Sequence, residues 1–172
     1  MEKKFLSPVY HIKKIPIKKI RANSYNPNKV ALPELNLLQK SILMDGYTMP
    51  IVCYYLETED CYEIVDGYHR FLVMKNDEFI AQRENNQLPV VVIDKPLSER
   101  VASTIRHNRA RGTHSIDNMV SIIKGLIESG LSDQWIIDNI GMDKNELLRI
   151  KQISGLVSLF TDNDFSEGWE EI

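Results

Sequence analysis

The stretch from Ile64 to Phe71 constrains the fold more than any other part of the chain. A β-branched run ends abruptly at Asp66-Gly67, and a His-Arg pair then opens an amphipathic segment, so the pattern predicts a strand, a glycine turn and a helix N-terminus. Unpaired backbone N–H groups and the positive end of the helix dipole attract anions at such a start. We therefore expect Gly67, His69 and Arg70 to bind phosphate. Asp66 could hold a metal ion or accept a proton, and His69 could donate one, so both are candidate catalytic residues.

The same residues also fit a plain strand-to-helix connection. In that interpretation Asp66 is an ordinary N-cap, and His69 and Arg70 lie in solvent. The order of the signals around the turn favours the phosphate site.

The turn resembles the Gly-x-x-Arg-x-x-Ala motif of the ParB/sulfiredoxin superfamily, in which Gly67 and Arg70 match and Val73 takes the small-residue place. The resemblance implies that the turn binds the phosphates of a nucleotide, namely ATP, ADP or CTP, with Mg²⁺. Tyr68 stands where sulfiredoxins carry the catalytic cysteine, so sulfiredoxin chemistry is not expected. ParB-like free serine kinases carry Asp-Gly-His-His-Arg at this place, and this chain departs from that wording only at Tyr68.

Two upstream segments extend the resemblance. Ile15-Pro16-Ile17 followed by Asn26-Pro27-Asn28 is similar to the entry strand and Asn-Pro turn of ParB N-terminal domains. Gly46-Tyr47-Thr48-Met49-Pro50 resembles the ParB Gly-x-x-x-Pro loop that precedes a strand. This likeness implies that the loop lines the nucleotide pocket through Gly46, Thr48 and Pro50.

A downstream segment, Arg106 to Gly112, sits where ParB proteins carry Glu-Asn-x-Gln-Arg. The resemblance implies that Asn108 and Arg111 contact the phosphates and that Asn108 helps to hold Mg²⁺ together with the aspartate of the turn. His107 replaces a glutamate that helps to hold the metal, and Ala110 replaces the glutamine. These departures argue against a CTP clamp of the chromosome-partition type.

The periodicity of the chain predicts an α+β fold, a ParB/sulfiredoxin-like small mixed sheet with helices followed by an all-helical unit. The expected strands are Ile12–Ile17, Ile51–Tyr55, Tyr62–Val65 and Pro89–Ile93. The expected helices are Pro33–Met44, His69–Asn76, Ser98–Arg106 and Ile116–Ser129. The polar stretch Asp77–Gln87 is expected to be a helix end and a loop.

The segment Gly130–Leu156 is typical of a helix-turn-helix. Ser132 and Asp143 are the expected N-caps of two short helices that are separated by a turn at Gly141. The second helix offers three basic residues for DNA, which are Lys144, Arg149 and Lys151. Residues 132–156 hold three basic against four acidic residues, however, and that balance disfavours strong autonomous DNA binding. A protein-docking or dimerisation unit is the alternative.

With 172 residues, 43% of them hydrophobic, the chain can bury a substantial core. We expect three parts: a nucleotide-binding domain at 1–112, a helical domain at 113–160 and an acidic tail at 161–172. The two cysteines are expected to be buried free thiols rather than a disulfide. No apolar leader or membrane-length segment is present in the sequence, so the cytoplasm is the expected compartment, without membrane association.

Three functions remain open from the sequence. The favoured one is a nucleotide-binding, ParB-like regulator acting in DNA-associated or prophage and plasmid gene regulation, by resemblance to IbrB-type co-activators that occur beside a phosphosulfate-reductase-like partner. The second is a phosphotransferase or nucleotide hydrolase similar to the free serine kinases. The third is a scaffold without catalysis. The expected partners are a nucleotide, DNA, the reductase-like protein and a second copy of the chain.

Overall fold

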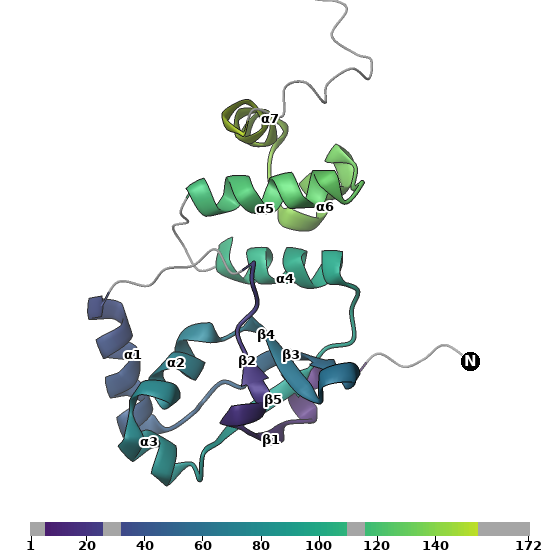
Figure 1. The fold of residues 1–172 in the computed structure, drawn as a ribbon. Coiled ribbons are helices and arrows are strands. Elements are labelled where there is room, and N and C mark those ends of the chain that lie inside the picture. Colours follow the sequence, from purple (N-terminus) through teal and green to yellow (C-terminus); the bar gives the residue numbers. More distant parts are fainter. Residues whose placement is uncertain (1–5, 26–31, 110–115, 155–172) are drawn as a thin grey trace, which may run out of the picture. The chain divides into compact units, whose positions relative to one another are not determined.

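The computed structural model describes residues 6–25, 32–109 and 116–154 of the protein. The chain divides into two compact units, Met1–His114 and Ser115–Ile172. The first unit contains a sheet and four α-helices, and the second contains three α-helices (Figure 1). The predicted α+β class is confirmed.

The first unit is built on a curled five-stranded sheet. Its strands are β1 (Lys13–Pro16), β2 (Ile20–Arg21), β3 (Ile51–Leu56), β4 (Cys61–Asp66) and β5 (Gln87–Val92). They lie in the order β1-β5-β3-β4-β2, with β3 and β4 forming an antiparallel pair and β3 and β5 a parallel one. A register shift between Val52 and Cys53 interrupts the β3–β4 ladder close to the end of β4. On its other side β4 pairs with β2 only at Tyr62 and Glu63, so the end of β4 has β3 as its one strand neighbour.

The helices of the first unit are α1 (Leu32–Asp45), α2 (Tyr68–Asn76), α3 (Glu78–Arg83) and α4 (Leu97–Arg109). Short 3-10 helices span Pro8–Tyr10, Ile17–Lys19 and Glu57–Glu59. In Figure 1, α1, α2 and α3 gather on one side of this unit, and α4 lies over another part of the sheet near β4. The sheet thus separates the α2 layer from the α4 layer.

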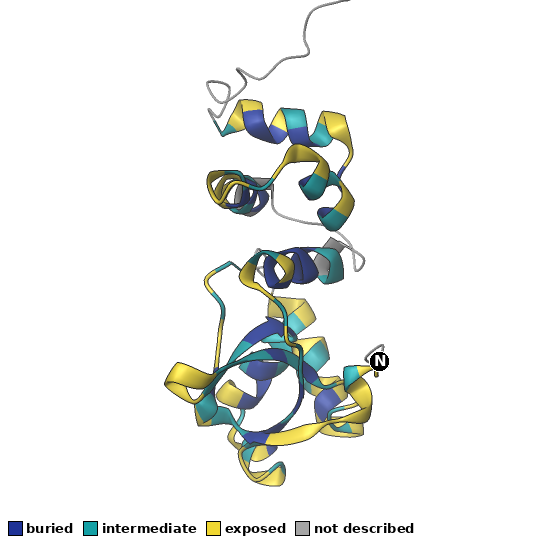
Figure 2. Cartoon of the chain, turned by 90° about the vertical axis from the view of Figure 1, so that its right-hand side faces the viewer, coloured by how far each residue is buried: buried dark blue, intermediate teal, exposed yellow. Residues whose placement is uncertain are grey.

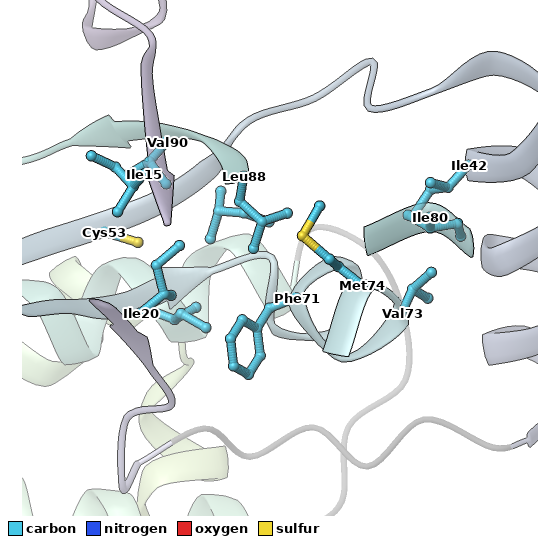
Figure 3. Packing of buried hydrophobic residues seen from close by; sticks show 12 residues of the cluster. Ile15, Ile20, Ile42, Cys53, Phe71, Val73, Met74, Ile80, Leu88 and Val90 are labelled. Carbon is cyan, nitrogen blue, oxygen red and sulfur yellow. The ribbon is translucent and has the colours of Figure 1, made fainter. Parts of the chain in front are cut away.

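The core of the first unit forms between α2, its neighbouring helices and the strands. Figure 3 shows Phe71 and Met74 of α2 close to Ile20 and Leu88 from the strands. The other buried members of this cluster are Ile15, Ile42, Ile51, Cys53, Ile64, Val73, Ile80 and Val90. In Figure 2 the buried segments of this unit lie mainly on the strands and on the helices that cover them. Burial of so many branched apolar side chains is the main force that holds α2 on the sheet.

Two elements of the first unit differ from the prediction. The expected strand Ile12–Ile17 is shorter, because Ile17 opens a 3-10 helix that leads into the short strand β2. The stretch after α2 was predicted to be a helix end and loop, and it contains α3 instead. The Asp77 side chain caps α3 by accepting a hydrogen bond from the Ile80 amide (2.9 Å), and Ile80 is fully buried. One apolar anchor plus a good N-cap outweighs the polar composition of this segment.

The second unit contains α5 (Ile116–Glu128), α6 (Asp133–Ile140) and α7 (Lys144–Ile153). The two predicted N-caps are confirmed, because Ser132 accepts from the Trp135 amide and Asp143 from the Glu146 amide. Gly141 ends α6 in the left-handed region, with φ of 72°. The buried apolar residues of the unit are Met119, Ile123, Leu126, Ile136, Ile140, Met142, Leu147 and Ile150.

Both cysteines are free thiols, as predicted. Cys53 is buried, and this burial raises the pKa of its thiol. Cys61 is partly exposed, so the prediction that both thiols are buried is wrong for this residue. Within the described ranges, no helix has the length and apolar character needed to cross a membrane.

Candidate functional site

The turn between β4 and α2 has the conformation that the sequence predicts for an anion site. Gly67 is the N-cap of α2 and adopts a left-handed conformation, with φ of 95°. The first helical hydrogen bond runs from the Phe71 amide to the Gly67 carbonyl (3.1 Å), and no side chain caps the helix start. Asp66 is therefore not the N-cap, and the plain interpretation of this turn is wrong on that point. A helix start without a side-chain cap leaves room for an external anion.

Gly67 lies against the side chain of Arg70. A Cβ atom at position 67 would be 2.7 Å from Arg70 Nη2 and 3.0 Å from Ile51 Cδ1. Both approaches are shorter than ordinary van der Waals contact, so only glycine fits here without displacing a neighbour. The turn is thus a close-fitting cradle in which the Arg70 guanidinium lies directly on the backbone.

Asp66, Arg70 and His107 come together at this turn. Asp66 Oδ2 is 3.4 Å from Arg70 Nη2 and 3.6 Å from His107 Nδ1. The side chain of Asp66 is 7% exposed, that of Arg70 13% and that of His107 42%. Arg70 is consequently not a solvated surface residue, and the Asp66 carboxylate faces two potential cations in a mostly buried place.

Helix α4 brings His107 to the turn through a row of polar contacts on one helical face. Arg100 Nη1 is 2.8 Å from Glu63 Oε1, and the Arg100 guanidinium lies 3.8 Å above the Tyr54 ring centroid. One turn later, Thr104 Oγ1 donates to the Val65 carbonyl (2.8 Å). The contacts of Arg100 and Thr104 were not predicted, although polar residues at i, i+4 and i+7 signal a shared helical face.

The loop Gly46–Pro50 contacts the same turn. Gly46 ends α1 with φ of 74°, and its amide donates to the Ile42 carbonyl (3.0 Å). The Tyr47 hydroxyl donates to the Arg70 carbonyl (2.9 Å). Thr48 is exposed and Pro50 partly so. The structure therefore places the predicted pocket loop beside the predicted phosphate turn, two segments that are twenty residues apart in the chain.

His69 follows Tyr68 in the first turn of α2 and is partly buried. This burial lowers the pKa of His69 below its ordinary value of 6.5; Asp66 opposes that shift and Arg70 adds to it. The imidazole is thus neutral at pH 7 and can donate or accept one hydrogen bond without carrying a charge.

We expect the stability of the protein to fall as the pH drops below about 6.5. The unfolded chain protonates His69 near that pH, whereas the folded chain protonates it only at lower pH, so acid favours the unfolded state. Urea unfolding between neutral and mildly acidic pH will measure the effect. In the His69→Gln variant the unfolding free energy should depend less on pH, by a slope that corresponds to a fraction of one proton. The control is His11→Gln at an exposed histidine, and its unfolding free energy should follow that of the wild type.

The remaining predicted site residues of the first unit lie partly or wholly outside the described residues. Asn108 lies in the last turns of α4, directly after His107, but its side chain is outside the described residues, and so is all of Arg111. Among the described residues no group of three or more His, Cys, Asp or Glu side chains could hold a metal ion. Asp66 is the one predicted Mg²⁺ ligand whose side chain is described, and it is engaged by Arg70.

The basic residues of α7 have different environments. Lys144 and Arg149 are exposed. Lys151 is buried, and its Nζ lies 2.5 and 2.6 Å from the two carboxylate oxygens of Asp133. Its charge therefore helps to join α7 to the start of α6.

The first unit has a curled mixed sheet and a glycine turn that opens a helix, and the second unit has short capped helices. These are the features of ParB-like proteins with a helix-turn-helix unit. The ParB N-terminal domain matches residues 1–108, and the IbrB-like C-terminal HTH domain matches residues 114–162. The chain belongs to the ParB N-terminal domain family.

Proteins similar to this chain include one curated protein and two solved structures. The uncharacterized protein YbdM of Escherichia coli strain K12 is 46% identical over 147 residues, which are 86% of this chain and 70% of YbdM. A second similar protein is the C-terminally truncated chromosome-partitioning protein ParB of Caulobacter crescentus, complexed to the centromeric parS site. Its structure has a TM-score of 0.53 at 19% sequence identity, and the match covers 82% of this chain and 71% of the ParB chain. The structure of the same protein complexed with CTP-gamma-S has a TM-score of 0.48 at 21% sequence identity. The match covers 84% of this chain and 78% of the ParB chain.

Proposed function

We propose that this protein is a nucleotide-binding, ParB-like regulator in which the turn Asp66–Arg70 holds the phosphates. The observation that carries the proposal is the Gly67 cradle, a helix start that no side chain caps and that lies against the guanidinium of Arg70. Backbone amides, a helix dipole and a forked cation converge on one small space, and this combination suits a phosphate group.

Each side chain of the turn has a distinct proposed role. Arg70 donates a fork of hydrogen bonds to phosphate oxygens, and His69 donates one more from its neutral ring. Asp66 fixes the guanidinium in place, since the two groups are only 3.4 Å apart. Thr48 and Pro50 stand at the side of the turn, where the sugar or base of the nucleotide would lie. Asn108 and Arg111 are proposed to complete the phosphate contacts, in line with the family motif.

Mg²⁺ fits this site only together with phosphate. A magnesium ion in proteins is commonly held by one or two carboxylates plus substrate phosphates and water. Asp66, with Asn108 as second ligand, would supply the protein part of such a set. The ion would neutralise phosphate charge, and we propose that it binds with the nucleotide rather than before it.

The test is thermal unfolding with ATP, ADP, CTP or GTP, each with and without Mg²⁺. A ligand that binds only the folded state raises the unfolding temperature in proportion to the logarithm of its concentration over Kd. A rise with one nucleotide would support the proposal and identify the base. No rise with any of the four would overturn it and leave the scaffold function as the better explanation.

We further propose that the second unit contacts DNA through α7, as its HTH domain match suggests. Because Lys144 and Arg149 are exposed and Lys151 is buried, only the first two should contact phosphates. We expect Lys144→Ala and Arg149→Ala each to lower the salt slope of binding to a mixed-sequence duplex by about 0.9, the value for one phosphate. The control Lys124→Ala, at an exposed lysine of α5, should leave the slope unchanged. Equal salt slopes in the wild type and all three variants would exclude α7 as the DNA-contacting helix.

One observation favours the second candidate, a phosphotransferase or hydrolase. His107 Nδ1 lies 3.6 Å from the buried Asp66 carboxylate, which is longer than a hydrogen bond. Contacts between catalytic groups are often long without ligand, and a histidine that an aspartate orients on substrate binding is a common general base. Turnover of the bound nucleotide that disappears in the Asp66→Asn variant would support this candidate. Bound nucleotide that stays intact would exclude it. The proposed homodimer and the reductase-like partner rest on the family resemblance.

A further inference from the structure

Tyr47 lies in the loop Gly46–Pro50, but its side chain points into the domain. The ring packs against the core cluster of the first unit, and the hydroxyl donates to the Arg70 carbonyl at 2.9 Å. Burial also raises the pKa of Tyr47, so the hydroxyl keeps its proton under all ordinary conditions. A hydroxyl that is committed to a backbone carbonyl does not also serve a ligand as donor.

Arg70 is consequently held at both ends. Its guanidinium lies against Gly67 and pairs with Asp66, while its carbonyl accepts the hydrogen bond from Tyr47. This hydrogen bond joins the loop directly to the residue that is proposed to bind phosphate. A displacement of the loop would therefore also displace the first turn of α2, and a displacement of that turn would move the loop.

The start of the loop is fixed independently. Arg83 of α3 donates from Nη2 to the Ile42 carbonyl (2.9 Å) and from Nη1 to the Leu43 carbonyl (3.0 Å), so it caps the last turn of α1. The Gly46 amide also donates to Ile42. With its start held in this way, the position of Thr48 and Met49 depends on the Tyr47 anchor.

We propose that Tyr47 is a positioning residue that couples the pocket loop to the phosphate turn and thereby sets the affinity for nucleotide without touching it. The inference rests on the proposed function. Without the hydroxyl, the loop occupies its binding-competent position for a smaller fraction of the time. The apparent Kd rises in inverse proportion to that fraction.

The test compares Tyr47→Phe with a matched control. Tyr55→Phe also removes one hydroxyl that makes a 2.9 Å hydrogen bond, in that case to the exposed Asp60. Asp60 precedes the start of β4, whereas the turn follows the opposite end of this strand. Nucleotide affinity is measured by calorimetry at a temperature where circular dichroism shows all three proteins to be folded. We expect the Kd of Tyr47→Phe to rise by up to about fivefold, the limit set by the loss of one ordinary hydrogen bond, and that of Tyr55→Phe to stay at the wild-type value.

Hydrogen exchange provides a second measurement that a purely structural role would not affect. Nucleotide should protect the amides of the first turn of α2 in both wild type and Tyr47→Phe, but those of Gly46–Met49 only in the wild type. An unchanged Kd or undiminished loop protection in Tyr47→Phe would overturn the inference while leaving the proposed function intact. Absence of nucleotide binding by the wild type would overturn both.

Discussion

Arg70→Ala is expected to lose nearly all of the stabilisation that a nucleotide gives to the wild type. Hydrogen bonds to a charged group contribute about 1.5–3 kcal/mol, so removal of the guanidinium should weaken nucleotide binding by roughly 10- to 150-fold. The loss should be similar for every nucleotide, because Arg70 is proposed to contact phosphate rather than base. Thermal unfolding and calorimetry with the nucleotide that binds the wild type will measure it.

Arg70→Ala also removes a cation from Asp66, whose side chain is only 7% exposed. A carboxylate left in such a place without its partner destabilises the folded state, so the free variant should unfold at a lower temperature than the wild type. The double variant Asp66→Asn/Arg70→Ala is the control, because it removes the uncompensated charge. We expect it to regain stability but not nucleotide binding.

Arg70→Lys separates charge from geometry. Lysine retains the positive charge but presents a single ammonium group instead of a planar fork, and we expect it to recover only part of the affinity. Nucleotide affinity that persists in Arg70→Ala at the wild-type level would place the phosphates elsewhere and would contradict the proposed turn.

The conformation of the turn between β4 and α2 could be predicted because its signals are local. A β-branched run, a glycine and a His-Arg pair follow one another within eight residues, and the left-handed Gly67 and the start of α2 agree with them. The capped helices of the second unit were predictable for the same reason. Their N-caps, Ser132 and Asp143, act on amides only three residues away.

The contacts between distant segments could not be predicted in the same way. His107 faces Asp66 because α4 crosses β4 in one particular register, which also depends on the Glu63–Arg100 ion pair and on the Thr104 hydrogen bond to Val65. Nothing in the local sequence of α4 shows which strand it covers. The inward orientation of Tyr47 is a similar case, since the loop motif alone would equally allow its ring to line a ligand pocket.

Gly67→Ala should impair nucleotide binding by displacing Arg70, even though it removes no binding group. The added Cβ would lie 2.7 Å from Arg70 Nη2, 3.1 Å from Arg70 Nε and 3.0 Å from Ile51 Cδ1, so the guanidinium must shift away from the backbone of the turn. The methyl group would also lie beside the helix start at which the phosphate is proposed to bind. We expect an affinity loss comparable to that of Arg70→Ala, measured with the same nucleotide.

The stability of Gly67→Ala needs a control for backbone strain, since φ at this position is 95° and alanine in the left-handed region costs about 1–2 kcal/mol. Gly130→Ala is well matched, because Gly130 has φ of 82° and an added Cβ would meet nothing within 4 Å. Urea unfolding should therefore show that Gly130→Ala loses about 1–2 kcal/mol of stability, whereas calorimetry shows its nucleotide affinity unchanged. Gly67→Ala should lose at least as much stability, because its Cβ meets the Ile51 and Arg70 side chains in addition to the strain. If Gly67→Ala retained full nucleotide affinity, phosphate would not occupy the cradle, and the helix start at Tyr68 would be only a structural connection between β4 and α2.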